Sequence, residues 1–287
     1  MCQPCVSRQQ RPRCLRTGPG TRPGVTLVPT YGYRVTDLDF DDSEALADRM
    51  AATRMDLTVR EIRPLSPSMV RVLLTGDALR ELVTQPGQDL MVTATPPPDA
   101  VRRRWTISSL DREAGTVALD VVLHPGDAVS RLHEASPGDV VEAIGPRGKV
   151  HLVQGAAAHH FLGDQSFLPA AFVMAAAVQP PARAVVTLTV LAPEDRLELD
   201  AAACPEGVTW VEPVDDDEAT GRALLAASGL AAPEDGVVAY VGGEMSLAST
   251  IRSALVRDLG WSREAVMPKP YWRRGAPNAR HGEPSRD

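Results

Sequence analysis

The spacing of short apolar runs changes once along the chain, and this change constrains the fold more than any other feature. Before about residue 150, short runs rich in Val, Leu, Ile and Thr are separated by Pro or Gly, with no helical period between them. Six of these runs are predicted strands: 56–62, 69–74, 90–95, 103–108, 116–123 and 140–144. Short strands at this spacing are typical of an antiparallel barrel or sandwich. Residues 145–148 (Gly-Pro-Arg-Gly) are predicted to form the turn that closes it.

After about residue 155, strand-like runs alternate with helical ones. Strands are expected at 159–162, 184–191, 208–211 and 237–241, and helices at 167–178, 221–228 and 247–259. Alternation of this kind gives a parallel sheet covered by helices. The sequence therefore predicts a two-domain β + α/β protein, with an antiparallel β-barrel at 53–155 and an α/β parallel-sheet domain at 156–275.

The two ends of the chain lack these periodicities. Residues 1–52 begin with a stretch rich in Pro, Gly and Arg, and we expect a disordered or loosely packed extension that includes a short helix within 41–52. A disordered tail is expected at 276–287. Cys2 and Cys5 have a metal-like spacing in this structureless setting, and no metal site is predicted.

The charge distribution argues against general nucleic-acid binding. The net charge is -7, yet residues 1–34 hold six arginines and no acid, so the body of the protein is strongly acidic. Nonspecific affinity for nucleic acid depends largely on neutralising phosphates. No apolar run approaches the roughly twenty residues that span a bilayer, and there is no secretory signal pattern. We expect a cytoplasmic monomer that binds neither membrane nor nucleic acid.

Residues 102–108 combine three arginines, an indole and two hydroxyls on one predicted strand. Side chains alternate along a strand, so one face would carry Arg103, Trp105 and Ile107, and the other Arg102, Arg104 and Thr106. A guanidinium binds phosphate bidentately and an indole stacks on a planar group, which suits a flat, phosphorylated ligand. Taken alone, the run is more typical of a basic edge strand with a half-buried Trp.

Three later segments bear on ligand binding. Gly163 ends a predicted strand, and Ser166 is expected to cap the next helix, whose amides would face a ligand at the carboxyl edge of the sheet. Gly242 and Gly243 would let a ligand or another backbone come close. Residues 269–275 place a Lys, two aromatics and two arginines after the final helix. The Gly-x-Gly-x-x-Gly fingerprint is absent, so an ordinary dinucleotide Rossmann domain is not supported.

The order of these motifs resembles the siderophore-interacting protein family. It comprises Arg-x-aromatic-Thr, Val-Leu-His, Gly-Pro-Arg-Gly, Gly-Asp-x-Ser-x-Leu-Pro-Ala, Gly-Glu and Tyr-Trp-Arg-x-Gly, over roughly residues 55–275. Members of the family are FAD-dependent, NAD(P)H-using ferric-siderophore reductases of the ferredoxin-reductase-like superfamily. No single motif is specific, but their order and spacing are.

The resemblance implies a set of cofactor-binding residues. Arg103 would bind the FAD phosphates, Trp105 would stack on the isoalloxazine, and Thr106 would lie near its reactive edge. The remaining FAD positions are Ile107, Val122, His124, Ala128, Val129, Ser130, Tyr271 and Trp272. The nicotinamide nucleotide would face Gly163, Asp164, Ser166 and Glu244.

This chain departs from the family at several of these positions. Trp105 replaces a Tyr and Ser108 replaces an Arg. Leu132 replaces a Trp and Gln165 replaces a Glu, while Met91 stands where a substrate lysine is often found.

The implied activity is reduction of ferric siderophores by NADPH or NADH through FAD, which releases the iron. Flavin accepts a hydride and releases electrons singly, so no catalytic side chain is named. Anionic ferric siderophores would be drawn to cations, for which the candidates are Arg104, Arg131, Lys269, Arg273 and Arg274. Two alternatives remain open: a general flavin reductase or electron-transfer flavoprotein, and a degenerate member that binds a siderophore without redox chemistry.

Overall fold

The computed structural model describes residues 43–93, 102–123, 131–199, 201, 204, 207–214 and 216–274. All of them belong to one compact unit, Asp37–Asp287. The predictions made for residues 1–42 and 275–287 concern parts of the chain outside the described residues.

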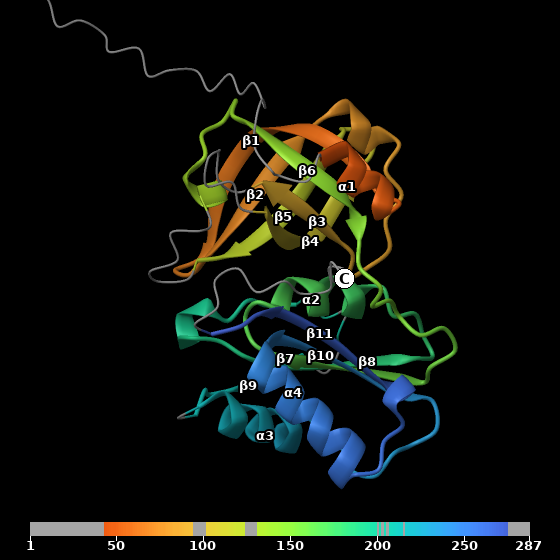
Figure 1. Ribbon diagram of the computed structural model, residues 1–287. Coiled ribbons are helices and arrows are strands. Elements are labelled where there is room, and N and C mark those ends of the chain that lie inside the picture. The colour runs from red at the N-terminus through yellow and green to blue at the C-terminus, as the bar shows by residue number, and fades with distance from the viewer. Residues whose placement is uncertain are drawn as a thin grey trace, which may run out of the picture. The chain divides into compact units, whose positions relative to one another are not determined.

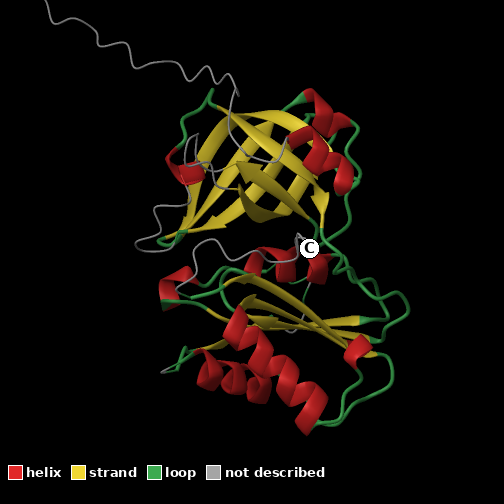
Figure 2. Ribbon diagram, viewed as in Figure 1, coloured by secondary structure: helices red, strands yellow, loops and turns green. Residues whose placement is uncertain are grey.

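Six antiparallel strands close into a barrel in the order β1-β2-β5-β4-β3-β6 (Figures 1 and 2). The strands are β1 (Thr53–Ser66), β2 (Met69–Thr75), β3 (Asp89–Thr93), β4 (Arg102–Asp111), β5 (Thr116–Val122) and β6 (Val140–Arg147). Alternate side chains fill the barrel core, among them the fully buried Leu57, Leu74, Leu90 and Leu119. All six predicted strands are present, the third as far as residue 93, where the described residues stop, and the barrel is the architecture adopted.

The predicted closing turn at residues 145–148 is wrong for its first three residues. Gly145 pairs with Thr53 of β1, and Arg147 pairs with Asp89 of β3, so this segment is the end of β6. A Cβ at Gly145 would collide with the Leu90 side chain, and so the glycine permits the close approach of β6 and β3. The chain turns only at Gly148, whose φ is +110°.

Short helices surround the barrel. The helix expected within 41–52 is α1 (Ser43–Arg49), which packs on the outer wall with Leu46 and Ala47 against Met91 and Ile144. The 3-10 helices η1 (Asp77–Arg80) and η2 (Arg131–Glu134) connect barrel strands.

A five-stranded sheet of order β11-β10-β7-β8-β9 forms the second part, and every neighbouring pair is parallel. Its strands are β7 (Ala158–Gly163), β8 (Arg183–Thr189), β9 (Val208–Val211), β10 (Val237–Glu244) and β11 (Val266–Trp272). The strand order changes direction beside β7, because β8 lies on one side of it and β10 on the other. Ligands of open parallel sheets bind at the carboxyl ends beside such a switch point.

Helices cover both faces of the sheet (Figure 1). On one face, α2 (Leu168–Ala176) packs in a cluster with Phe161, Leu188 and Tyr240. On the other, α3 (Asp217–Ala227) and α4 (Met245–Ser253) pack over a second cluster. The π-helical turn η4 (Ala254–Asp258) extends α4, so the predicted helix at 247–259 is confirmed. The 3-10 helices η3 (Pro193–Asp195) and η5 (Arg263–Ala265) complete this part.

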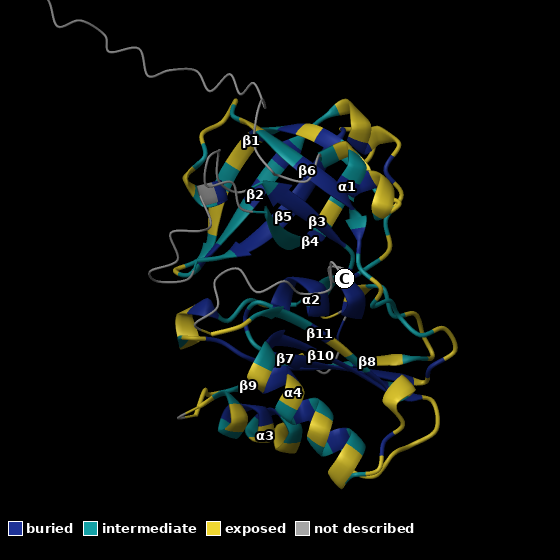
Figure 3. Ribbon diagram, viewed as in Figure 1, coloured by how far each residue is buried: buried dark blue, intermediate teal, exposed yellow. Residues whose placement is uncertain are grey.

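Burial follows this arrangement. Figure 3 shows buried residues along the strands of the sheet and exposed residues on the outer sides of α3 and α4. No helix in the described part of the chain is both long enough and apolar enough to cross a bilayer.

The strand β11 was not predicted, because residues 269–275 were identified only as a segment that follows the final helix. Pro268 and Pro270 argue against a strand, since neither can donate a ladder hydrogen bond. The segment is an edge strand that pairs only with β10 among the described residues, and an edge tolerates proline.

Candidate functional site

The strand β4 turns Arg103, Trp105 and Ile107 to the side of the barrel core. The β3 partners of Arg103 and Trp105 are Val92 and Leu90, both fully buried in that core. Ile107 belongs to the same core, and the partly buried Trp105 packs against it. The predicted alternation of faces is therefore confirmed, and the indole of Trp105 is held by the barrel core.

Thr106 connects the barrel with the last strand of the sheet. Its buried hydroxyl oxygen lies 3.2 Å from the hydroxyl oxygen of Tyr271 on β11. The Tyr271 ring in turn packs at a tilt against Phe167, with 6.3 Å between the ring centroids. Two residues predicted to lie beside the same ligand are thus brought together from distant parts of the sequence.

A single buried carboxylate holds two of the predicted substrate cations. The Asp89 side chain is fully buried, and its oxygens accept hydrogen bonds from Arg104 Nε at 3.1 Å and Arg104 Nη2 at 2.9 Å. Lys269 Nζ lies 3.6 Å from Asp89 Oδ2 and donates to the carbonyl of Gly87. The same ammonium is 5.2 Å from the centroid of the Tyr271 ring. This cluster of Asp89, Arg104 and Lys269 carries a formal charge of about +1, since two cations face one carboxylate.

The other substrate candidates lie elsewhere. Arg274 donates to Asp217 Oδ1 at 2.9 Å and Oδ2 at 3.2 Å, and these hydrogen bonds raise the pKa of its guanidinium. Arg273 is exposed, and the side chain of Arg131 lies outside the described part. The predicted cations therefore do not form one continuous group among the described side chains.

At the carboxyl edge of the sheet, the Asp164 carboxylate joins the loop after β7 to the end of β10. Its Oδ1 accepts from the Ser166 amide at 2.8 Å and the Ser166 hydroxyl at 2.6 Å, and its Oδ2 accepts from the Glu244 amide at 2.7 Å. The prediction that Ser166 caps α2 is wrong, because the N-cap is Phe167 and no side chain caps that end. The Ser166 hydroxyl is instead used by Asp164.

Glu244 is the buried N-cap of α4. Its carboxylate accepts hydrogen bonds from the amides of Ser246 and Leu247, and its other oxygen accepts from the Arg274 amide at 3.0 Å. The carboxylate thus already holds the start of α4 and the end of β11.

The glycines at this edge make room for side chains of the chain itself. Gly163 and Gly242 pair across β7 and β10, and a Cβ on either would collide with the Phe167 ring. Gly243 has φ +119°, and a Cβ there would lie 2.6 Å from Asp164 Cγ. A ligand or another backbone was expected close to Gly242 and Gly243; the neighbours in the structure are the side chains of Phe167 and Asp164.

A hydrogen-bond network joins the sheet loops to the β1–β2 turn, and of its side chains only Gln165 was singled out in the sequence, as a departure from the family. Asp195 Oδ1 accepts from Ser66 Oγ at 2.6 Å and from the Ser68 amide at 2.9 Å. Gln165 Nε2 donates to Ser68 Oγ at 2.6 Å, and Gln165 Oε1 accepts from the Leu191 amide at 3.5 Å. Burial raises the pKa of Asp195, but the hydrogen bonds from Ser66 and Ser68 outweigh it and lower the pKa below its ordinary value. No sequence signal reveals this network, because its partners are far apart along the chain.

The remaining cofactor positions divide between described and undescribed parts. Val122 ends β5 and packs against the core cluster around α2, which includes Met69, and Trp272 is the last residue of β11. The predicted positions His124, Ala128, Val129 and Ser130 lie outside the described residues.

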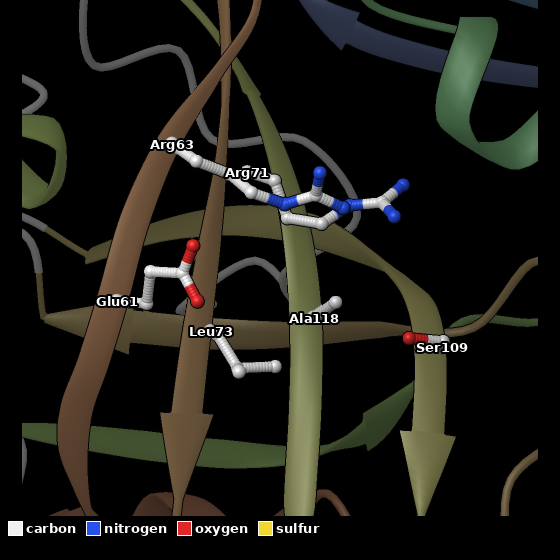
Figure 4. Close-up of a pocket in the computed structure, with 6 residues that line it drawn as sticks. All are labelled: Glu61, Arg63, Arg71, Leu73, Ser109 and Ala118. Atoms are coloured by element: carbon white, nitrogen blue, oxygen red, sulfur yellow. The ribbon is translucent and has the colours of Figure 1, made fainter.

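A separate cavity of about 390 Å³ lies on the barrel wall (Figure 4). It is lined by Glu61, Arg63, Arg71, Leu73, Ser109 and Ala118. Arg71 is paired with the buried Asp120, with Nε and Nη2 at 2.7 and 2.8 Å from the carboxylate oxygens. None of the predicted cofactor residues lines this cavity.

Two family models match the chain over most of the two parts described above. The siderophore-interacting FAD-binding domain matches residues 91–150, and the siderophore-interacting protein model matches residues 156–275. An uncharacterised protein of Mycobacterium tuberculosis is 27% identical over 255 residues, which cover 74% of this chain and 88% of that protein.

Three solved structures are similar to this chain over 77–81% of its length. A siderophore utilization protein from T. fusca has a TM-score of 0.70 and 26% identity, covering 81% of this chain and 97% of that one. The siderophore-interacting protein SipS from Aeromonas hydrophila has a TM-score of 0.63 and 29% identity, covering 77% and 99%. Phthalate dioxygenase reductase, at 16% identity and a TM-score of 0.58 over 78% of this chain and 69% of that one, shares the fold. The chain has the ferredoxin-reductase-like fold and belongs to the siderophore-interacting protein family.

Proposed function

We propose that this protein is an FAD-dependent NAD(P)H oxidoreductase that reduces ferric siderophores and so releases their iron. The observation that carries the proposal is the contact between the Thr106 and Tyr271 hydroxyls. It joins the strand predicted to bind FAD to the strand beside β10, whose carboxyl end is predicted to face the nicotinamide nucleotide. Hydride transfer requires the two ligands to meet at such a junction.

The residues on β4 fit a flavin nucleotide. Trp105 offers a partly exposed indole held by the barrel core, and Arg103 lies on the same side of the strand. The buried Ser108 hydroxyl has no hydrogen-bond partner among the described residues, and a ligand could satisfy it. When bound, FAD would supply the chemistry of accepting a hydride from NAD(P)H and releasing electrons one at a time to iron.

The chain's own residues would then have positioning and electrostatic roles. Trp105 would support the flat ring, and Arg103 would neutralise phosphate. The excess positive charge of the Asp89, Arg104 and Lys269 cluster, next to Tyr271, would favour the approach of an anionic ferric chelate. Reduction weakens the hold of hard oxygen ligands on the iron, so no side chain needs to move a proton.

The absorption spectrum of the purified protein tests the proposal. We expect the oxidised flavin bands near neutral pH, and their loss when NAD(P)H is added without oxygen. Arg103→Ala should release FAD, whereas Arg63→Ala removes the same charge from another barrel strand and should retain it. A colourless protein that takes up no added FAD would overturn the proposal.

One observation favours a second function, a general flavin reductase or electron-transfer flavoprotein. Arg104 and Lys269 are both occupied by Asp89, which leaves less positive charge for an anionic chelate. Turnover with ferric chelates should exceed turnover with quinones or a ferredoxin if siderophores are the substrates. The opposite order would support the second function.

A further inference from the structure

We propose that the protein uses NADH in preference to NADPH, because carboxylates at the ends of β8 and β9 would repel the 2′-phosphate of NADPH. The inference rests on the proposed function and adds the identity of the electron donor. Its residues are Glu194, Arg196 and Glu212, none of which was assigned a role above.

The topology places these residues where the adenosine end of a dinucleotide binds. The switch point lies between β7 and β10, and a dinucleotide that begins there extends along the carboxyl edge toward β8. In doubly wound folds, an acidic residue after the second strand binds the ribose hydroxyls, whereas an arginine there accommodates a 2′-phosphate. Here the second strand of the sheet is β8, and residues 190–196 follow it.

The charges at this edge are mainly negative. Glu194 and Glu212 are exposed. Within residues 190–199 and 211–214, Arg196 is the only cation. Arg196 Nη2 donates to Glu212 Oε1, so this guanidinium is already paired with a carboxylate. A 2′-phosphate would have to displace Glu212 and approach Glu194, whereas ribose hydroxyls can donate to either carboxylate.

The backbone that carries Glu194 and Arg196 is anchored between them by Asp195. Asp195 lies between Glu194 and Arg196, is buried, and accepts the hydrogen bonds from Ser66 and Ser68. A loop held in this way keeps the backbone of Glu194 in place after β8, so an incoming phosphate would meet negative charge there and the repulsion should appear as a difference in affinity.

Two measurements on the FAD-loaded protein test the proposal. Calorimetric titration of the oxidised protein should give a dissociation constant at least about tenfold lower for NAD+ than for NADP+. Anaerobic flavin reduction should show the same order for NADH and NADPH. Equal affinities, or tighter binding of NADP+, would overturn the inference while leaving the proposed function intact.

Variants identify the groups responsible. Glu194→Gln/Glu212→Gln removes both carboxylates and frees Arg196, and it should tighten NADP+ binding about tenfold with little change for NAD+. Glu234→Gln removes the same charge beside the amino end of β10, at the opposite edge of the sheet, and should change neither value. Arg196→Ala should leave the wild-type preference intact; a selective loss of NADP+ binding would instead make Arg196 a phosphate ligand and contradict the proposal.

A protein that binds FAD but neither nucleotide would refute both this inference and the NAD(P)H part of the proposed function. A protein without FAD would refute the proposed function on the separate evidence of its spectrum.

Discussion

The barrel strand β4 and the carboxyl edge of the sheet both carry predicted binding residues, but they use their polar groups differently. At the sheet edge, Asp164 and Glu244 accept hydrogen bonds from backbone amides that hold β7, β10 and α4 together. On β4, the indole is fixed by the apolar core, and the charge of Arg104 is balanced by Asp89 from the next strand. Two carboxylates at the sheet edge therefore accept hydrogen bonds from the backbone of that edge. In the β4 region, a single carboxylate balances the charge of two cations.

The largest effect is expected from Asp89→Asn. This change leaves Arg104 and the buried Lys269 without their shared carboxylate, and an uncompensated buried charge should reduce the free energy of unfolding by about 3–5 kcal/mol. Urea unfolding followed by fluorescence would measure it. The control is Asp217→Asn, which breaks the more exposed ion pair with Arg274 and should cost less than about 1 kcal/mol. Equal losses of unfolding free energy in the two variants would show that the Asp89 cluster stabilises the protein no more than an exposed ion pair.

Close packing at the sheet edge predicts the next effect. Gly242→Ala should reduce the free energy of unfolding by about 2–3 kcal/mol, since the new methyl group meets the Phe167 ring. Combining it with Phe167→Leu should make the cost of Gly242→Ala smaller, because the ring that it meets is gone. A strictly additive double variant would contradict the assignment.

A histidine buried in the sheet, His160, should make the stability of the protein depend on pH. Burial, with smaller contributions from Arg183 and His159, lowers the pKa of His160 from 6.5 to about 4. The folded state thus disfavours the protonated form, so this stability is present above pH 6.5 and is lost as the pH falls toward 4. Between pH 7.5 and pH 5 the free energy of unfolding should fall by about 2 kcal/mol from this group. His160→Leu should remove that share of the fall.

The control for His160 is Thr187→Val. It also removes a buried polar group from the sheet but no titratable one, so the dependence on pH should remain. An unchanged dependence in His160→Leu would mean that other groups cause the acid sensitivity.

The smallest effect concerns the cap of α4. Glu244→Gln keeps the shape of the side chain but removes the charge that accepts three backbone amides, and should cost about 1 kcal/mol. Thermal unfolding of this variant beside Glu234→Gln would measure it. A loss as large as that of Asp89→Asn would erase the difference between the two regions.

Most of the fold could be predicted, because short strands with Pro and Gly between them, and the later alternation with helices, are local signals. The strand β11 could not be predicted, because its prolines are acceptable only in an edge strand, and which strand lies at the edge depends on the whole sheet. The strand conformation of residues 145–147 could not be predicted for a similar reason, because these residues continue β6 by pairing with β1 and β3.

The candidate site was predictable to the same extent. Alternation along β4 is a local property, so the facing of Arg103 and Trp105 followed from the sequence. The engagement of Arg104 and Lys269 by Asp89 did not, because it needs both the β3–β4 pairing and the packing of β11 beside the barrel. Sequence order gives no distance between charges that tertiary structure brings together.

The β1–β2 turn has a consequence for engineering the protein. Tips of β-hairpins are usually the safest places for an inserted tag or a new chain terminus, because few contacts depend on them. Here Ser66 and Ser68 hold Asp195 and Gln165, and through them the loops that follow β8 and β7. An insertion at this hairpin would thus disturb the loops at the carboxyl edge of the sheet.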